Sequence, residues 1–289
     1  MTDGHGKQGR CHVGTGGGAA VSRPFGESMC APMNERRSAR NPLWAAYETI
    51  AMVIGLGALA AICLVWLPFA MLLHPLLPRR IGQPLGRAVI SGGFRGYLAL
   101  LTVLCASRFD LSELDRLRGQ GPLIVAANHP SLLDAVMIVS RLPNAVCVMK
   151  ASLLDNILFG SAARLAGYIR NDAPLEMILK AREELRRGAQ LVIFPEGTRT
   201  TQFPVDACQP IIGLISGRAG VPVQSLLIEF STPYLGKAWP LFRRPALPLS
   251  FRIRLGRRFP PPADIVAFSA ELEACFRAEL DMNPPPTVA

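Results

Sequence analysis

Charged residues are scarce in this chain, and acidic residues are scarcer than basic ones. Of its 289 residues only 18% are charged, and 31 Lys and Arg residues stand against 21 Asp and Glu residues, a formal net charge of +10. Soluble domains usually contain about 25% charged residues. Half of the chain is hydrophobic, which excludes a wholly disordered protein. Low charge with a basic surplus indicates a membrane or another anionic partner.

Several motifs of common enzyme and metal sites are also missing. The seven cysteines are odd in number, widely spaced and never form a CxxC pair, so neither a disulfide framework nor a zinc site is predicted. No GxSxG sequence occurs, which argues against the serine elbow of the α/β-hydrolases. The histidines are only His5, His12, His74 and His129. His129 is the only histidine after residue 74, so if the part of the chain beyond that residue uses a histidine as a base, it is His129.

One long stretch of the chain is free of charge. Residues 49–73 include no charged residue and no histidine. As a helix this stretch would be about 37 Å long, against about 30 Å for the hydrocarbon core of a bilayer. A membrane helix is therefore predicted in preference to a buried core helix. A second stretch, residues 82–107, is interrupted by Arg87 and Arg95, so we expect an amphipathic or re-entrant helix at the membrane surface.

Basic residues flank the long uncharged stretch on both sides, and this leaves its topology open. The residues are Arg36, Arg37 and Arg40 before it, and Arg79, Arg80 and Arg87 after it. A single span usually carries its basic residues on one side, whereas a hairpin within one leaflet returns both flanks to the same side. The predicted organisation is a disordered leader (1–43), membrane-anchoring helices as a span or hairpin (44–107), an α/β domain (108–281) and a disordered tail (282–289).

Apolar strand-like segments alternate with helical segments after residue 121. The expected strands are residues 122–127, 145–149, 190–194, 222–228 and 249–255. The expected helices are residues 132–142, 153–166, 175–187, 210–218 and 269–280. This alternation predicts an α/β fold, with a mostly parallel sheet flanked by helices and preceded by the membrane-embedded helical segment.

The first candidate for chemistry is the pair His129 and Asp134, in the sequence Asn-His-Pro-Ser-Leu-Leu-Asp after an expected strand. A carboxylate one helical turn into the helix can bond the imidazole Nδ1–H and stabilise the imidazolium. The other ring nitrogen is then free to accept a proton from a substrate hydroxyl. The same spacing occurs by chance in many proteins, so the alternative is a loop histidine and an ordinary helix-start aspartate.

The second candidate is the sequence Phe-Pro-Glu-Gly-Thr-Arg at residues 194–199, which follows another expected strand. Ligands of α/β sheets bind beyond the carboxyl ends of the strands, so this segment and His129 are expected at the same edge. Gly197 permits an unusual backbone conformation, and Arg199 has the planar fork that suits phosphate. Glu196 would orient the arginine or hold a substrate hydroxyl. The alternative is an ordinary turn with a surface Glu–Arg pair.

Residues 128–134 and 194–199 together resemble two signature blocks of the lysophospholipid acyltransferase family, which includes 1-acylglycerol-3-phosphate acyltransferases. The resemblance covers about residues 85–230, and the segments 150–153 and 167–171 look like its bacterial members. It implies transfer of an acyl group from a thioester of CoA or acyl carrier protein to a hydroxyl of a glycerol-phosphate lipid. On this resemblance His129 and Asp134 are catalytic, and the residues that bind substrate are Glu196, Gly197, Thr198 and Arg199, with Arg170 and Lys150 as further candidates.

Two segments depart from the family pattern. Arg170 stands in a different register from the arginine of the family's middle block. Residues 203–208 read Phe-Pro-Val-Asp-Ala-Cys, where many members have a basic residue and a glycine. We expect direct acyl transfer with no acyl-enzyme, no metal and no cofactor beyond the thioester co-substrate. The oxyanion would be bound by backbone N–H groups near residues 130–131 or at the start of the helix that follows.

The resemblance also implies where the protein works and what it binds. Membrane lipids and acyl-CoA or acyl carrier protein are the expected partners, at the cytoplasmic face of the inner membrane, and the sequence sets no oligomeric state. The alternatives are another bacterial lipid acceptor, a non-catalytic membrane-bound relative, and a Ser–His hydrolase using Ser131. A nucleic-acid binder is not expected, because the arginines are not clustered with aromatic residues on one element.

Overall fold

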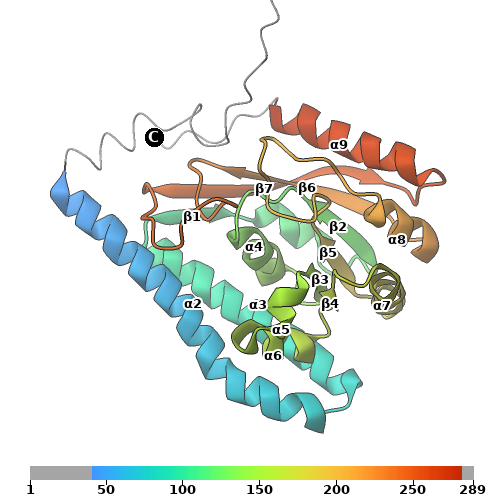
Figure 1. Cartoon of the computed structure of the whole chain (residues 1–289), viewed down its shortest axis with the longest axis horizontal. Helices are drawn as coiled ribbons and strands as arrows, with labels where there is room; N and C mark the ends of the chain where they lie inside the picture. The colour runs from blue at the N-terminus through green and yellow to red at the C-terminus, as the bar shows by residue number, and fades with distance from the viewer. Residues whose placement is uncertain (1–40, 282–289) are drawn as a thin grey trace, which may run out of the picture.

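The computed structural model describes residues 41–281, in which a helical hairpin precedes an α/β domain (Figure 1). The predicted disordered segments, 1–43 and 282–289, lie outside the described residues except for residues 41–43. Pro42 already belongs to the first described helix, and the Asn41 side chain caps that helix by accepting a hydrogen bond from Leu43 N–H at 3.0 Å.

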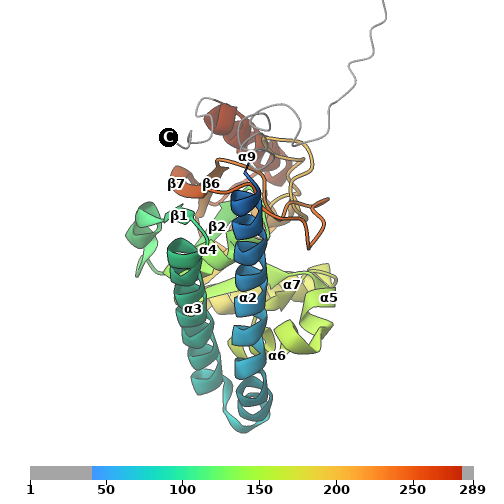
Figure 2. The same cartoon turned by 90° about the vertical axis from the view of Figure 1, so that its left-hand side faces the viewer.

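The hairpin consists of α2 (Pro42–Leu76) and α3 (Arg79–Leu104). Only two residues join them, so the helices run antiparallel and side by side (Figure 2). The uncharged stretch 49–73 lies wholly within α2. The second stretch also forms a helix, but α3 begins at Arg79 and ends at Leu104, three residues earlier at each end than the expected stretch 82–107.

Helix α2 is long and apolar enough to cross a membrane. Its most apolar window has a mean hydropathy of 2.6, and only 17% of that window is buried within the protein. A core helix of a soluble protein would be mostly buried, so this exposure favours the predicted membrane helix over the core-helix alternative. The exposed apolar side chains of α2 include Leu43, Ile50, Val53, Leu64, Val65, Phe69 and Leu72.

The α/β domain confirms the predicted fold class. Its strands are β1 (Ser107–Asp110), β2 (Leu123–Ala127), β3 (Ala145–Met149), β4 (Ile169–Arg170), β5 (Gln190–Ile193), β6 (Val223–Phe230) and β7 (Leu249–Phe259). They form one sheet in the order β1-β7-β6-β2-β5-β3-β4. Every neighbouring pair is parallel except β6 and β7. The first strand, β1, was not expected from the sequence.

Helices cover both faces of the sheet. They are η1 (Ser112–Leu117), α4 (Leu133–Arg141), α5 (Ala151–Asp155), α6 (Ile157–Ala166), α7 (Pro174–Arg186), α8 (Ile211–Ala219) and α9 (Ile265–Asp281). Side chains of β2 alternate between two apolar clusters, because successive residues of a strand point to opposite faces. Leu123, Val125 and Ala127 face the side of α3 and α4, and Ile124 and Ala126 face the side of α7, α8 and α9.

The single helix expected at residues 153–166 is two helices. Asn156 separates α5 from α6, and its side chain accepts hydrogen bonds from Leu158 N–H and Phe159 N–H. A residue whose side chain bonds the backbone in this way favours a new helix start over helix continuation. Helix α6 packs against both α2 and α3. The domain is therefore in contact with the hairpin along much of its length.

Candidate active site

His129 and Asp134 lie together at the carboxyl end of β2, as the sequence predicted. Imidazole Nδ1 is 2.8 Å from a carboxylate oxygen of Asp134. The Asp134 side chain is fully buried and also accepts a hydrogen bond from Ser131 N–H at 2.7 Å. Burial raises the pKa of the Asp134 carboxyl, and the bonds from His129 and Ser131 oppose that rise. The arrangement holds the imidazole in one orientation with Nε2 directed away from the carboxylate.

The imidazole of His129 has a second support that the sequence pattern did not indicate. The ring stacks on Phe194, with centroids 3.8 Å apart and the planes inclined by 15°. The His129 side chain remains 16% exposed. Phe194 is the first residue of the second motif, so the two motifs touch through these rings. The stacking leaves one ring edge for Asp134 and directs the other, with Nε2, away from that carboxylate.

Glu196 ties the two motifs together through the backbone. One carboxylate oxygen accepts hydrogen bonds from His129 N–H at 2.8 Å and the Thr200 hydroxyl at 2.9 Å, and the other accepts from Asp206 N–H at 3.0 Å. Glu196 is buried, and burial raises the pKa of its carboxyl. These contacts give Glu196 a positioning task within the site in place of the predicted contact with Arg199 or a substrate hydroxyl.

Arg199 is half-buried beside the same edge of the sheet. Its Nη1 donates to the carbonyl oxygens of Leu235 and Gly236 at 3.0 and 2.7 Å. No other hydrogen bond of this guanidinium is found within residues 41–281, so Nη2 and Nε are available to an anion. Burial lowers the pKa of Arg199, and the negative charge of Asp134 opposes that effect. A cation thus sits near the His129–Asp134 pair.

The segment after β6 also lies over the site, and sequence analysis did not include it. Leu235 adopts a positive φ of 54°, and its carbonyl oxygen accepts a hydrogen bond from Leu132 N–H as well as from Arg199. The Tyr234 carbonyl accepts the Ser131 hydroxyl proton at 2.8 Å. These are backbone carbonyl contacts, which leave no signature in side-chain identity.

Ser131 has a structural environment. Its side chain is buried, donates to Tyr234 and accepts from Leu133 N–H at 3.2 Å. The hydroxyl is not bonded to His129, which argues against the hydrolase alternative. The backbone N–H groups of residues 131–134 each donate to an acceptor within the protein. These N–H groups are therefore already engaged within the protein, and the expectation that this segment binds the oxyanion stays a prediction.

The remaining predicted site residues are unequally placed. Gly197 and Thr198 are exposed in the turn between Glu196 and Arg199. Lys150 is exposed at the start of α5. Arg170 lies on the edge strand β4, three strands from β2, and its guanidinium bonds Asp172 and Asp155 at distances from 2.5 to 3.3 Å. Arg170 therefore already has two carboxylate partners.

Gly197 is the position where the turn demands glycine. Its φ is +68°, and a Cβ there would lie 2.6 Å from the side-chain nitrogen of Gln209. We expect Gly197→Ala to cost about 1–3 kcal/mol of stability and to lower activity by displacing its neighbours Glu196 and Arg199.

A matched control for that variant is Gly188→Ala. Gly188 has a φ of +81° but nothing within 4 Å of an added Cβ, so it carries the backbone strain without the crowding. Equilibrium unfolding and catalytic rates of both variants separate the two effects. Equal losses of activity in the two variants would contradict the crowding argument.

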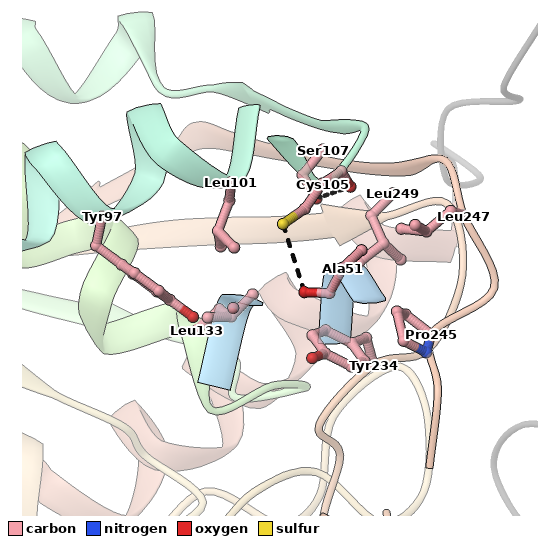
Figure 3. Close-up of a pocket in the computed structure, with 11 residues that line it drawn as sticks. Ala51, Tyr97, Leu101, Cys105, Ser107, Leu133, Tyr234, Pro245, Leu247 and Leu249 are labelled. Carbon is pink, nitrogen blue, oxygen red and sulfur yellow. Dashed lines mark hydrogen bonds between the residues drawn. The ribbon is translucent and has the colours of Figure 1, made fainter. Parts of the chain in front are cut away.

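An apolar pocket adjoins the candidate site (Figure 3). It lies between α2, α3, the start of α4 and the segment between β6 and β7. Leu133 precedes Asp134, and Tyr234 supplies the carbonyl that holds Ser131, so two lining residues belong to the site's own framework. The lining side chains also include Ala51, Tyr97, Leu101, Cys105, Leu247 and Leu249.

Comparison with known proteins agrees with this geometry. Residues 108–229 match the model of the acyltransferase family. A 1-acyl-sn-glycerol-3-phosphate acyltransferase of Pseudomonas aeruginosa is 27% identical over 199 residues, which are 67% of this chain and 74% of the relative. A protein of the same name from Helicobacter pylori is 35% identical over 85 residues, covering 27% of this chain and 36% of that relative.

A solved structure shares the fold. The crystal structure of the 1-acyl-sn-glycerophosphate acyltransferase of Thermotoga maritima superposes with a TM-score of 0.60. The match covers 86% of this chain and 97% of that one at 17% sequence identity. At this identity the likeness concerns the fold, including helices that precede the α/β domain.

Proposed function

Because the α/β domain of this chain belongs to the acyltransferase family, and the protein is an acyltransferase enzyme, we propose that it acylates a lysophospholipid. The acceptor we propose is 1-acylglycerol 3-phosphate, which would give phosphatidic acid. The donor is an acyl thioester of CoA or acyl carrier protein. The observation that carries the proposal is the His129–Asp134 pair, whose carboxylate is fully buried, with the half-buried Arg199 close enough for its charge to interact with Asp134.

In the proposed mechanism His129 is the general base. Nε2 accepts the proton of the acceptor hydroxyl while Asp134 holds Nδ1–H and stabilises the imidazolium. The acceptor oxygen forms a bond to the thioester carbonyl carbon, and the tetrahedral intermediate then loses the thiolate. The imidazolium returns its proton to that thiolate, which leaves as a thiol. No acyl-enzyme forms, since the Ser131 hydroxyl is occupied with the Tyr234 carbonyl.

Arg199 is the proposed ligand of the acceptor phosphate. Two backbone carbonyls fix one edge of its guanidinium, so the free edge is pre-oriented for a phosphate oxygen pair. We expect Arg199→Met to raise the KM for the phosphate-bearing acceptor by about 30-fold or more, because a charge-assisted hydrogen bond is worth about 2 kcal/mol or more. Acylation kinetics with varied acceptor concentration measure this.

Two further arginine variants sharpen the test. Arg218→Met, at an exposed position in the last turn of α8, is the charge-matched control and should leave the KM unchanged. Arg170→Met should have a smaller effect than Arg199→Met, because Asp155 and Asp172 already bind that guanidinium. An Arg170 effect as large as that of Arg199 would instead place the acceptor near β4.

We propose that the hairpin α2–α3 lies within one leaflet and does not span the bilayer. Near the start of α2, Glu48 accepts a hydrogen bond from Leu247 N–H, and α2 also packs against α6. If α2 crossed the bilayer along the membrane normal, one of its ends would lie across the membrane from the domain. That end of α2 could then not keep its contact with the domain. In the proposed arrangement the active site faces the lipid surface on the cytoplasmic side of the inner membrane.

The test is acyl transfer by the reconstituted protein. Proteoliposomes would be supplied with labelled acyl-CoA or acyl-ACP and 1-acylglycerol 3-phosphate. Label in phosphatidic acid that depends on His129 would support the proposal. If transfer fails with this acceptor but proceeds with another hydroxylated lipid, the alternative acceptor stands. The atypical segment 203–208 favours that alternative, because Asp206 sits where many family members have a basic segment and its N–H bonds Glu196.

A non-catalytic role is the remaining alternative. The intact His129–Asp134 hydrogen bond, with the Asp134 carboxylate fully buried, argues against it. If no acceptor in the panel is acylated by wild-type protein, and cells carrying His129→Ala keep a wild-type lipid composition, the non-catalytic alternative gains support.

A further inference from the structure

The segment between β6 and β7 presents an unusual surface. Residues 230–248 include no acidic residue but contain Lys237, Arg243 and Arg244, all exposed. Between these cations stand Leu241, 52% exposed, and Phe242, 80% exposed. Large apolar side chains such as these are costly to leave in water, and here they stand directly beside basic ones. Their combination is typical of protein segments that meet a charged lipid surface.

The turn that carries these residues is held by its own contacts, so their exposure is built into the fold. Trp239 Nε1 donates to the Arg243 carbonyl at 3.1 Å, and the Arg243 guanidinium lies 4.6 Å from the Trp239 ring centroid. Two backbone bonds, Trp239 N–H to the Gly236 carbonyl and Arg243 N–H to the Pro240 carbonyl, close the turn. Leu241 and Phe242 lie within the turn that these contacts close, and their side chains remain exposed to solvent.

The turn lies beside the membrane-anchoring hairpin. Glu48 of α2 accepts a hydrogen bond from Leu247 N–H at 3.2 Å, and its other carboxylate oxygen is 3.8 Å from Arg244 Nε. Figure 2 shows the segment next to the first turns of α2. In that part of α2 the exposed apolar side chains are Leu43, Ile50 and Val53. Exposed apolar side chains therefore occur both in this part of α2 and in the segment that its Glu48 contacts.

We propose that residues 237–244 form a second membrane-contacting element, which we name the basic loop. Leu241 and Phe242 enter the boundary between headgroups and acyl chains. Lys237, Arg243 and Arg244 bind the phosphates of anionic lipids. The charge favours an anionic leaflet over a protein partner or a second copy of this chain, because both the loop and the whole chain are basic.

The basic loop has a direct connection to the candidate site. Its first residue follows Leu235 and Gly236, whose carbonyl oxygens hold Arg199. Hydrogen bonds from Thr201 and Gln202 outweigh burial and lower the pKa of Asp206, and the charge of Lys237 adds to that effect. The Asp206 N–H in turn bonds Glu196. Seating the loop on a bilayer would therefore order the backbone that positions the proposed phosphate ligand. In this proposal, lipid contact at Lys237 is coupled to phosphate binding at Arg199 through the backbone of residues 235–237.

Photo-crosslinking in proteoliposomes tests the lipid contact. The full chain would carry p-benzoylphenylalanine at position 242, 266 or 65 and be reconstituted with labelled phosphatidylglycerol. Val266 of α9 is the matched control, since it is 76% exposed but lies on the opposite face of the sheet from the hairpin (Figure 1). Val65 of α2, 69% exposed, is the positive control. We expect lipid adducts at 242 and 65 at least about fivefold above those at 266.

The possible outcomes divide cleanly. Equal adducts at 242 and 266, with strong adducts at 65, would overturn the proposal. Protein–protein adducts of twice the mass at 242 would also overturn it and indicate a second copy of the chain as the occupant. This measurement needs no catalysis, so it stands or falls independently of the proposed acyl transfer.

Charge variants test the role of the basic residues. Arg243→Gln/Arg244→Gln should reduce the adduct yield at 242 in phosphatidylglycerol vesicles by up to about 25-fold, at about fivefold for each of the two charges lost near the surface. In phosphatidylcholine vesicles the change should be small. Arg243→Lys/Arg244→Lys keeps the charge and should restore the yield even though the contact with Trp239 is altered. No recovery by lysine would overturn the electrostatic part of the proposal.

Discussion

A His129→Ala variant is expected to lose about a thousandfold or more of its acyl-transfer rate. General-base catalysis by a positioned histidine contributes about 10² to 10⁴ in rate. The geometry places His129 toward the upper part of that range. Its Nδ1 is held 2.8 Å from a fully buried carboxylate, and its ring is fixed on Phe194. Within residues 41–281 Nε2 makes no hydrogen bond, so it is free for the acceptor hydroxyl.

The loss has to be separated from a loss of structure. Removing the ring also removes the stack on Phe194, which is worth about 0.5–1.5 kcal/mol. His129→Phe keeps an aromatic ring over Phe194 but has no base, so it should be as inactive as His129→Ala and more stable. His74→Ala, at an exposed position in α2, is the matched histidine control. A His129→Ala protein that retains a tenth of the wild-type rate would contradict the base assignment.

The candidate pair could be predicted from sequence because its chemistry is local. Asp134 lies five residues after His129, so a strand end and one helical turn suffice to bring the two side chains together. The meeting of this pair with residues 194–199 followed from parallel strands, whose carboxyl ends share one edge. Both inferences use rules that depend on residue type and spacing.

Other parts of the site depend on contacts that leave no such trace. Glu196 bonds His129 N–H, and Arg199 bonds two carbonyl oxygens, so the partners in each case are backbone atoms that any residue supplies. The segment 234–236 reaches the site only through the fold. The same reasoning applies to β1, a short strand that exists because it pairs with β7 from the far end of the chain.

The hairpin illustrates a third limit. Hydropathy identified α2, but the position of the hairpin depends on a buried polar contact that looks unfavourable for a membrane helix. Arg87 interrupts the apolar segment that forms α3. From sequence alone, a charged residue at this position predicts an exposed side chain. In the structure it is 5% exposed and points into the α/β domain. It joins the hairpin to the catalytic domain.

Breaking that junction is the second large expected effect. Arg87 Nη2 lies 2.5 Å from Glu184 of α7, and both side chains are less than one tenth exposed. Its other nitrogens donate to the Ala166 carbonyl at 2.9 Å and the Asn144 side chain at 3.0 Å. Removing one partner of a buried pair leaves an uncompensated charge and costs about 3–5 kcal/mol. We expect Glu184→Leu to destabilise the protein by that amount.

The two partners should not be equivalent. Arg187 also contacts Glu184, with Nη1 3.2 Å from the second carboxylate oxygen. After Arg87→Met, Glu184 therefore keeps a cationic neighbour, and the cost should be smaller than for Glu184→Leu. The double variant Arg87→Met/Glu184→Leu removes both charges and should recover part of the loss, because an apolar pair of similar volume tolerates burial.

Equilibrium unfolding in a mild detergent measures these differences as a double-mutant cycle. The matched control lies in the same helix: Lys180 and Glu176 form an exposed pair at 2.6 Å, and Lys180→Met should cost less than about 0.5 kcal/mol. Two outcomes would show that the buried pair does not hold the hairpin. One is a free energy of unfolding of Glu184→Leu within about 1 kcal/mol of wild type. The other is a loss of unfolding free energy in the double variant that equals or exceeds the sum of the two single losses. Burial of the Arg87–Glu184 pair thus distinguishes it from the surface pairs of α7.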